Sequence, residues 1–101
     1  MEDRINVALI GAGNWGKNLA RVFYELGVLK TICDSSEETL KRKSEKYPKI
    51  TTTSSFSDIL TSPDIHAIAI ATPAEQHYAL AKKSLLADKH VFVEKPLAMT
   101  A

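Results

Sequence analysis

Six residues near the start of the chain have the spacing G-x-G-x-x-G: Gly11, Ala12, Gly13, Asn14, Trp15 and Gly16. Such a loop binds a pyrophosphate when it joins a buried strand to a helix, because its backbone can approach the phosphates closely. Gly11 permits the tight turn, Gly13 lets the pyrophosphate approach, and Gly16 lets the helix pack closely on the strand. The helix N-terminus adds N–H donors and a partial positive charge. We therefore expect a dinucleotide-binding site, in preference to a purely structural glycine turn.

An acid follows this loop at the spacing expected for a ribose ligand. Asp34 lies 18 residues after Gly16, close to the spacing of about 20 that is typical of such acids. A 2′-phosphate about 4 Å from this carboxylate would be repelled by on the order of 4 kcal/mol before screening. Ser35 follows it, and no arginine is present there to offset the repulsion. Asp34 therefore favours NAD over NADP, although the same residue could also cap the next helix.

Two further polar segments follow apolar runs that we interpret as strands. Thr72 and Pro73 come after one such run, and Glu94, Lys95 and Pro96 end the last one. Ligands of open parallel sheets bind outside the carboxyl ends of the strands, where the strand order reverses. We therefore expect these residues to share one crevice with the glycine loop and Asp34.

The elements that must position these residues alternate in type along the chain. Short apolar runs indicate strands at residues 5–10, 28–33, 50–53, 65–71 and 90–94. Between them, the spacing of apolar residues and the capping signals indicate helices at residues 14–26 and 36–47, a short turn at 56–60, and a helix after 72–75. This order predicts an α/β fold with a doubly wound parallel sheet and right-handed crossovers.

The apolar spacing also predicts which helical side chains face the sheet. In the helix at 36–47, which is otherwise polar, these are Leu40 and Tyr47. In the first helix, the expected stripe comprises Trp15, Leu19, Val22, Phe23 and Leu26. In the last helix, the residues expected to face the sheet are Tyr78, Ala81, Leu85 and Leu86.

Composition bounds the class of protein. The chain has 101 residues, 45% of them hydrophobic, and a formal net charge of +1, which is typical of one globular domain and does not indicate nucleic-acid binding. We find no apolar run long enough to span a membrane and no secretory signal at the start, and we expect a cytoplasmic protein. Cys33 is the sole cysteine, which excludes an internal disulfide and any multi-cysteine metal site, so no metal is expected.

Taken together, the glycine loop, Ala71-Thr72-Pro73 with His77, and Glu94-Lys95-Pro96 resemble the Gfo/Idh/MocA family of sugar and cyclitol dehydrogenases. The resemblance covers nearly the whole chain and implies a Rossmann domain that binds NAD. Residues 16–18 and 23–29 look like the subgroup that acts on nucleotide-linked amino sugars. The substrate implied is a ring hydroxyl of a sugar or of a nucleotide-linked sugar, such as a UDP-N-acetyl amino sugar uronate.

The resemblance also implies roles for individual residues. Ala71, Thr72 and Pro73 would line the cofactor near its nicotinamide half, with Glu94 close by. Lys95 matches the family lysine that lies beside the nicotinamide of the cofactor and the substrate hydroxyl, where it positions the hydroxyl and takes part in proton transfer; a lowered lysine pKa would favour this role. Pro96 matches a proline often preceded by a cis bond. His77 matches a family histidine for which we expect a structural role, and we interpret His66 and His90 as structural too.

Family members continue past this point into a second domain that holds the substrate. We therefore expect residues 1–101 to be an incomplete dinucleotide-binding domain, inactive alone, with an exposed sheet edge and helical face that favour a homo-oligomer. One alternative is a stand-alone, non-catalytic module that binds a dinucleotide and regulates. Another is a methyltransferase with a glycine-rich loop, against which the third glycine and Glu94-Lys95-Pro96 argue.

Overall fold

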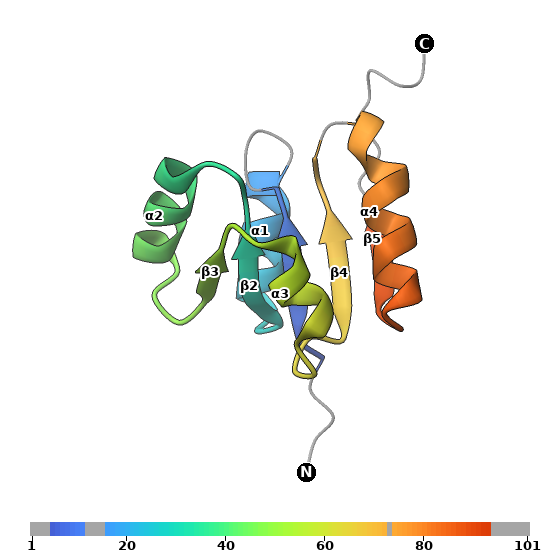
Figure 1. The fold of residues 1–101 in the computed structure, drawn as a ribbon. Helices are drawn as coiled ribbons and strands as arrows, with labels where there is room; N and C mark the ends of the chain where they lie inside the picture. The colour runs from blue at the N-terminus through green and yellow to red at the C-terminus, as the bar shows by residue number, and fades with distance from the viewer. Residues whose placement is uncertain (1–4, 12–15, 73, 94–101) are drawn as a thin grey trace.

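The computed structural model describes residues 5–11, 16–72 and 74–93, and these form one sheet with helices on both faces (Figure 1). The strands are β1 (Val7–Ile10), β2 (Leu29–Cys33), β3 (Thr51–Thr53), β4 (Ala67–Ile70) and β5 (His90–Val93). The helices are α1 (Gly16–Glu25), α2 (Glu37–Lys46), α3 (Phe56–Thr61) and α4 (Ala74–Leu86). No helix of the described residues is long and apolar enough to cross a membrane.

All strand pairs are parallel, and the order across the sheet is β3-β2-β1-β4-β5. The chain therefore builds the sheet outward from β1 to β3 and then returns to place β4 against the other side of β1. This reversal puts the switch point between β1 and β4, and it confirms the predicted doubly wound fold.

Each face of the sheet has its own core. On one face, α1 and α2 cover a cluster that contains Leu9, Ala20, Ile32 and Leu40. On the other face, α3 and α4 cover a cluster built largely of isoleucines from α3, β1 and β4 and the residues before β4. In Figure 1, α3 crosses in front of the sheet and α1 lies behind it. The central strands are covered on both faces, which explains their continuous apolar sequences.

The second helix is as predicted. Ser36 caps α2, and its Oγ accepts a hydrogen bond from the Thr39 N–H at 3.2 Å. Leu40 and Tyr47 are both buried. Because they are among the few apolar residues of this segment, their spacing was sufficient to define the buried face.

The stripe predicted for α1 is partly wrong. Leu19 and Phe23 pack against the core as expected, but Val22 and Leu26 are 39% and 68% exposed. The fully buried position is Ala20, one turn after Gly16, because the helix approaches the sheet through its smallest side chains. Trp15, which was expected in the same stripe, lies outside the described residues.

The face predicted for α4 is wrong at three of its four positions. Ala81 packs on the core, but Tyr78, Leu85 and Leu86 are 76%, 61% and 76% exposed. Leu80 and the fully buried Ser84 take their place. Ser84 is accommodated there because its hydroxyl donates to the Leu80 carbonyl at 2.8 Å.

Candidate functional site

The carboxyl ends of four strands form one polar edge, which we call the cofactor edge: Gly11, Asp34, Thr53 and the pair Ala71-Thr72. Backbone hydrogen bonds continue the sheet to this edge. The Gly11 N–H donates to the Cys33 carbonyl at 2.8 Å, and the Ala71 N–H donates to the Ile10 carbonyl at 2.8 Å. The Asp34 N–H donates to the Thr53 carbonyl at 3.2 Å. Residues distant in sequence are therefore held side by side, as the sequence predicted for Gly11, Asp34 and Thr72.

Gly11 occupies a position that other residues adopt only under strain. Its φ is +91°, and a Cβ there would lie 3.0 Å from the Thr72 Cγ2 and 3.1 Å from the backbone of Ala71. A side chain is therefore excluded by both the backbone conformation and the neighbouring loop after β4. The turn out of β1 thus runs directly against the end of β4, at the switch point of the sheet.

Gly16 brings the start of α1 against the same turn. A Cβ at Gly16 would overlap the carbonyl oxygen of Gly11 and would lie 3.4 Å from the Ala71 Cβ. Backbone can therefore pack on backbone here, the close contact that the sequence predicted for Gly16. A helix N-terminus next to a narrow glycine turn is suited to a pyrophosphate, so the described part of the loop fits a dinucleotide.

Asp34 follows β2 directly and is half-buried. Its Oδ1 accepts a hydrogen bond from the Ser36 N–H at 2.9 Å, which orients the carboxylate at the entrance to α2. The helix cap itself is Ser36. A carboxylate accepts about four hydrogen bonds, so this contact is compatible with binding two ribose hydroxyls as well.

A buried thiol lies beneath these groups. Cys33 is 4% exposed, and its burial, followed by the carboxylates of Asp34 and Asp58, raises the pKa of its thiol to about 11. A thiol with this pKa stays protonated at neutral pH and is a poor nucleophile or metal ligand. The chemistry of the cofactor edge therefore rests on backbone amides, hydroxyls and carboxylates.

Two residues at this edge, Thr53 and Asp58, were not identified as site residues from the sequence. The Thr53 hydroxyl donates to the Asp58 Oδ2 at 3.4 Å and accepts a hydrogen bond from the Ser55 N–H at 3.0 Å. Ser55 caps α3, and Asp58 lies in its first turn. The signal was available, because Ser55-Phe56-Ser57-Asp58 has the spacing of a capping sequence directly after a predicted strand.

Several predicted site residues cannot be placed. Gly13 and Lys95 lie outside the described residues, as do Ala12, Asn14, Trp15, Pro73, Glu94 and Pro96. The sequence placed His77 at the start of the last helix, and it falls within α4. The roles of all these residues stay predictions.

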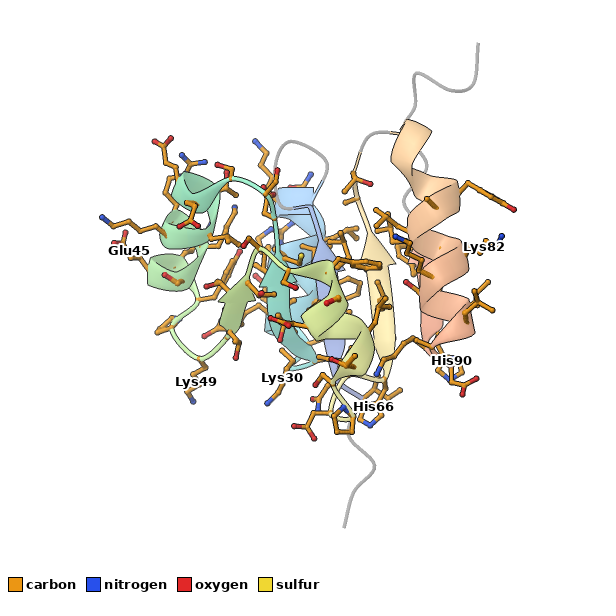
Figure 2. The ribbon with its side chains drawn as sticks, in the orientation of Figure 1. Lys30, Glu45, Lys49, His66, Lys82 and His90 are labelled. Carbon is orange, nitrogen blue, oxygen red and sulfur yellow. The ribbon has the colours of Figure 1, made fainter. Side chains whose placement is uncertain are left out.

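The opposite edge of the sheet holds the two other histidines. Figure 2 shows His66 and His90 at the end of the molecule where the strands begin, away from the cofactor edge. The His66 Nδ1 accepts a hydrogen bond from the Asn6 N–H at 3.0 Å. The His90 N–H donates to the His66 carbonyl at 3.1 Å. These contacts confirm the structural interpretation of His66 and place His90 in the same backbone network.

Comparison with known proteins agrees with this geometry. Residues 5–101 match the Gfo/Idh/MocA family, described as an oxidoreductase family with an NAD-binding Rossmann fold. Levoglucosan dehydrogenase from Pseudarthrobacter phenanthrenivorans is 33% identical over 106 residues, which cover 95% of this chain and 27% of that protein. A glycosyl hydrolase family 109 protein from Shewanella sp. is 35% identical over 97% of this chain and 24% of its own length.

A solved structure is similar in fold. Scyllo-inositol dehydrogenase from Lactobacillus casei, crystallised with NAD(H) and scyllo-inositol, superposes with a TM-score of 0.83 at 25% identity. The match covers 93% of this chain and 28% of that one. The chain thus spans between 24% and 28% of the length of these relatives.

Proposed function

The chain belongs to the Gfo/Idh/MocA oxidoreductase family and is an NAD-binding Rossmann domain, and from this premise we propose that it is the cofactor-binding part of a sugar dehydrogenase. The substrate proposed is a ring hydroxyl of a sugar or of a nucleotide-linked sugar, held by a second domain outside residues 1–101. The observation that carries the proposal is the contact of Gly16 with the turn at Gly11, beside Asp34.

Different residues of the cofactor edge would bind different parts of NAD. The amides at the start of α1 would bind the pyrophosphate, which Gly11 and Gly16 allow to approach the backbone. Asp34 would accept hydrogen bonds from the adenosine ribose, and its charge would disfavour a 2′-phosphate. Ala71, Thr72 and Pro73 would line the nicotinamide half, with Glu94 nearby.

Bound NAD supplies a ring that accepts a hydride. The chain's own contribution to the chemistry would come from Lys95, which follows β5 by two residues. Its ammonium would orient the substrate hydroxyl and take part in moving the hydroxyl proton. This role rests on the resemblance of Glu94-Lys95-Pro96 to the family motif.

The test is an assay of a longer polypeptide that contains this domain. NADH formation at 340 nm would be followed with cyclitols, anhydrosugars and nucleotide-linked sugars as candidate substrates. We expect one of these sugars to be oxidised, and Lys95→Ala to lower turnover about 100-fold or more with little change in cofactor affinity. Lys82→Ala, which removes an exposed lysine of α4, is the matched control.

Three results would contradict the proposal. Unchanged turnover in the Lys95→Ala variant would reject the role of Lys95. NADH binding without oxidation of any of these sugars would favour the alternative, a regulatory module that binds a dinucleotide without catalysis. Hydrolysis of a glycoside without net NADH formation would instead indicate the activity named for the Shewanella relative.

A further inference from the structure

A second carboxylate, that of Asp58, lies near the cofactor edge and contacts the end of β3, the strand next to the one that Asp34 follows. Asp58, in the first turn of α3, is connected to Asp34 through Thr53. The Thr53 carbonyl accepts from the Asp34 N–H at 3.2 Å, and the Thr53 hydroxyl donates to the Asp58 Oδ2 at 3.4 Å. Asp34, at the end of β2, and Asp58, in the first turn of α3, are therefore both connected to Thr53 at the end of β3.

Local contacts fix where the Asp58 carboxylate lies. The Asp58 N–H donates to both the carbonyl and the Oγ of Ser55, so the residue is anchored in the cap of α3. Thr53 contacts its side chain and also accepts from the Ser55 N–H at 3.0 Å. Asp58 is exposed, and its carboxylate contacts the Thr53 hydroxyl at the end of β3.

The influence of Asp58 reaches the end of β2. Burial is the main cause of the raised Cys33 pKa, and the carboxylates of Asp34 and Asp58 both add to it. Cys33 immediately precedes Asp34, so both acids contribute to the negative potential at the end of β2. A group bound beside Asp34 would experience this combined potential.

We propose that Asp58 is a second specificity-determining residue that disfavours a 2′-phosphate on the adenosine ribose, acting through its charge beside Asp34. The inference rests on the proposed binding of NAD at the cofactor edge. Asp34 would contact the ribose directly, whereas Asp58 would act from a greater distance. Replacing Asp34 alone would therefore leave part of the preference for NADH over NADPH intact.

The experiment measures the dissociation constants of NADH and NADPH by calorimetry for a set of variants of this chain. Asp58→Asn removes the charge and keeps an oxygen that can accept from Thr53, and Asp58→Glu keeps the charge. Asp64→Asn is the matched control, because Asp64 lines the same groove between β3 and α3 as Asp58 but precedes β4, toward the other edge of the sheet.

We expect Asp58→Asn to raise the affinity for NADPH relative to NADH by about fivefold at low salt, and Asp34→Asn to raise it by about a hundredfold. The double variant, with Asp34→Asn and Asp58→Asn, should raise the affinity for NADPH relative to NADH more than either single variant. Because Asp58 is exposed, the contribution of its charge to the preference for NADH over NADPH should shrink between about 0.01 M and 1 M salt. The Debye length falls over this range from about 30 Å to about 3 Å. A purely structural role of Asp58 would not produce this salt dependence. Asp58→Glu and Asp64→Asn should retain the original ratio.

The possible failures are distinguishable. A correctly folded chain that binds neither nucleotide would overturn the proposed cofactor site itself. If NADH binds and Asp58→Asn leaves the NADPH-to-NADH ratio equal to that of Asp64→Asn, the role of Asp58 is rejected. Equal weakening of both nucleotides by Asp58→Asn would also reject it, because that result indicates a structural contribution only.

Discussion

The α1–α2 side of the sheet and the α4–β5 end differ in how their helices meet the strands. In the first region, Ala20, Leu40 and Tyr47 are buried, and a glycine contact brings α1 against β1. In the second, α4 buries Ser84 and leaves Tyr78 and Leu86 each 76% exposed. Figure 1 shows α4 next to β4 and β5, on the opposite side of the sheet from α2 in this view.

Backbone packs directly on backbone at Gly11 and Gly16 in the first region. The first region carries Gly11, Gly16 and Asp34, and the proposed binding of NAD there depends on the close approach of backbone at the two glycines. The region of α4 and β5 packs on the core through Leu80 and Ala81 and is also held by polar contacts at the opposite edge. There the Lys89 ammonium, 9% exposed, donates to the carbonyls of Ser62 and Ile65 at 2.6 and 2.7 Å.

The largest effect is expected when Gly16, in the first region, is replaced by alanine. Gly16→Ala should lower the free energy of unfolding by about 3 kcal/mol and abolish NADH binding, because its Cβ overlaps backbone. Gly27→Ala is the matched control: its φ is +78°, but no atom lies within 4 Å of its Cβ position. It should cost about 1 kcal/mol and leave binding intact. If urea unfolding shows that Gly16→Ala and Gly27→Ala lose the same free energy of unfolding, the special role of Gly16 is contradicted.

A pair of leucines compares the two regions directly. Leu40→Ala in α2 should lower the free energy of unfolding by about 3 kcal/mol, because Leu40 is 8% exposed. Leu86→Ala in α4 should change it by less than about 0.5 kcal/mol. The measurement is again urea unfolding of this chain. A large loss for Leu86→Ala would show that the α4 face predicted from apolar spacing was right after all.

The smallest of these effects concerns the polar contacts of the second region. Lys89→Met should lower the free energy of unfolding by about 2 kcal/mol, since the buried carbonyl of Ile65 and the half-buried carbonyl of Ser62 lose a charged donor. Lys82→Met, at an exposed position of α4 (Figure 2), should be neutral within about 0.5 kcal/mol. If the two variants unfold alike, Lys89 does not hold this end of the sheet together.

The doubly wound fold and the convergence of Gly11, Asp34 and Thr72 could be predicted from the sequence, because the strands that carry them have strong local signals. Apolar runs that end in glycine or polar residues defined β1, β2 and β4, and parallel pairing then placed Gly11, Asp34 and Thr72 at one edge. The sparse apolar residues of α2 identified its buried face without ambiguity.

The buried face of α4 could not be predicted in the same way. Leucine and alanine occur around most of this helix, so several faces satisfy the helical spacing equally well. Packing then selected Leu80, Ala81 and Ser84, and the burial of Ser84 depends on its hydrogen bond to the Leu80 carbonyl. The connection of Asp58 to Asp34 through Thr53 was also hidden, because it depends on the pairing of β2 with β3.

The most direct test of the cofactor edge is an NMR titration of the labelled chain with NADH. Binding as described predicts the largest amide shifts at Gly11, Gly16, Asp34 and Thr72, and small shifts at His66 and His90 on the opposite edge. Saturable shifts centred on His66 and His90, or none at the carboxyl ends of β1 and β2, would contradict the site.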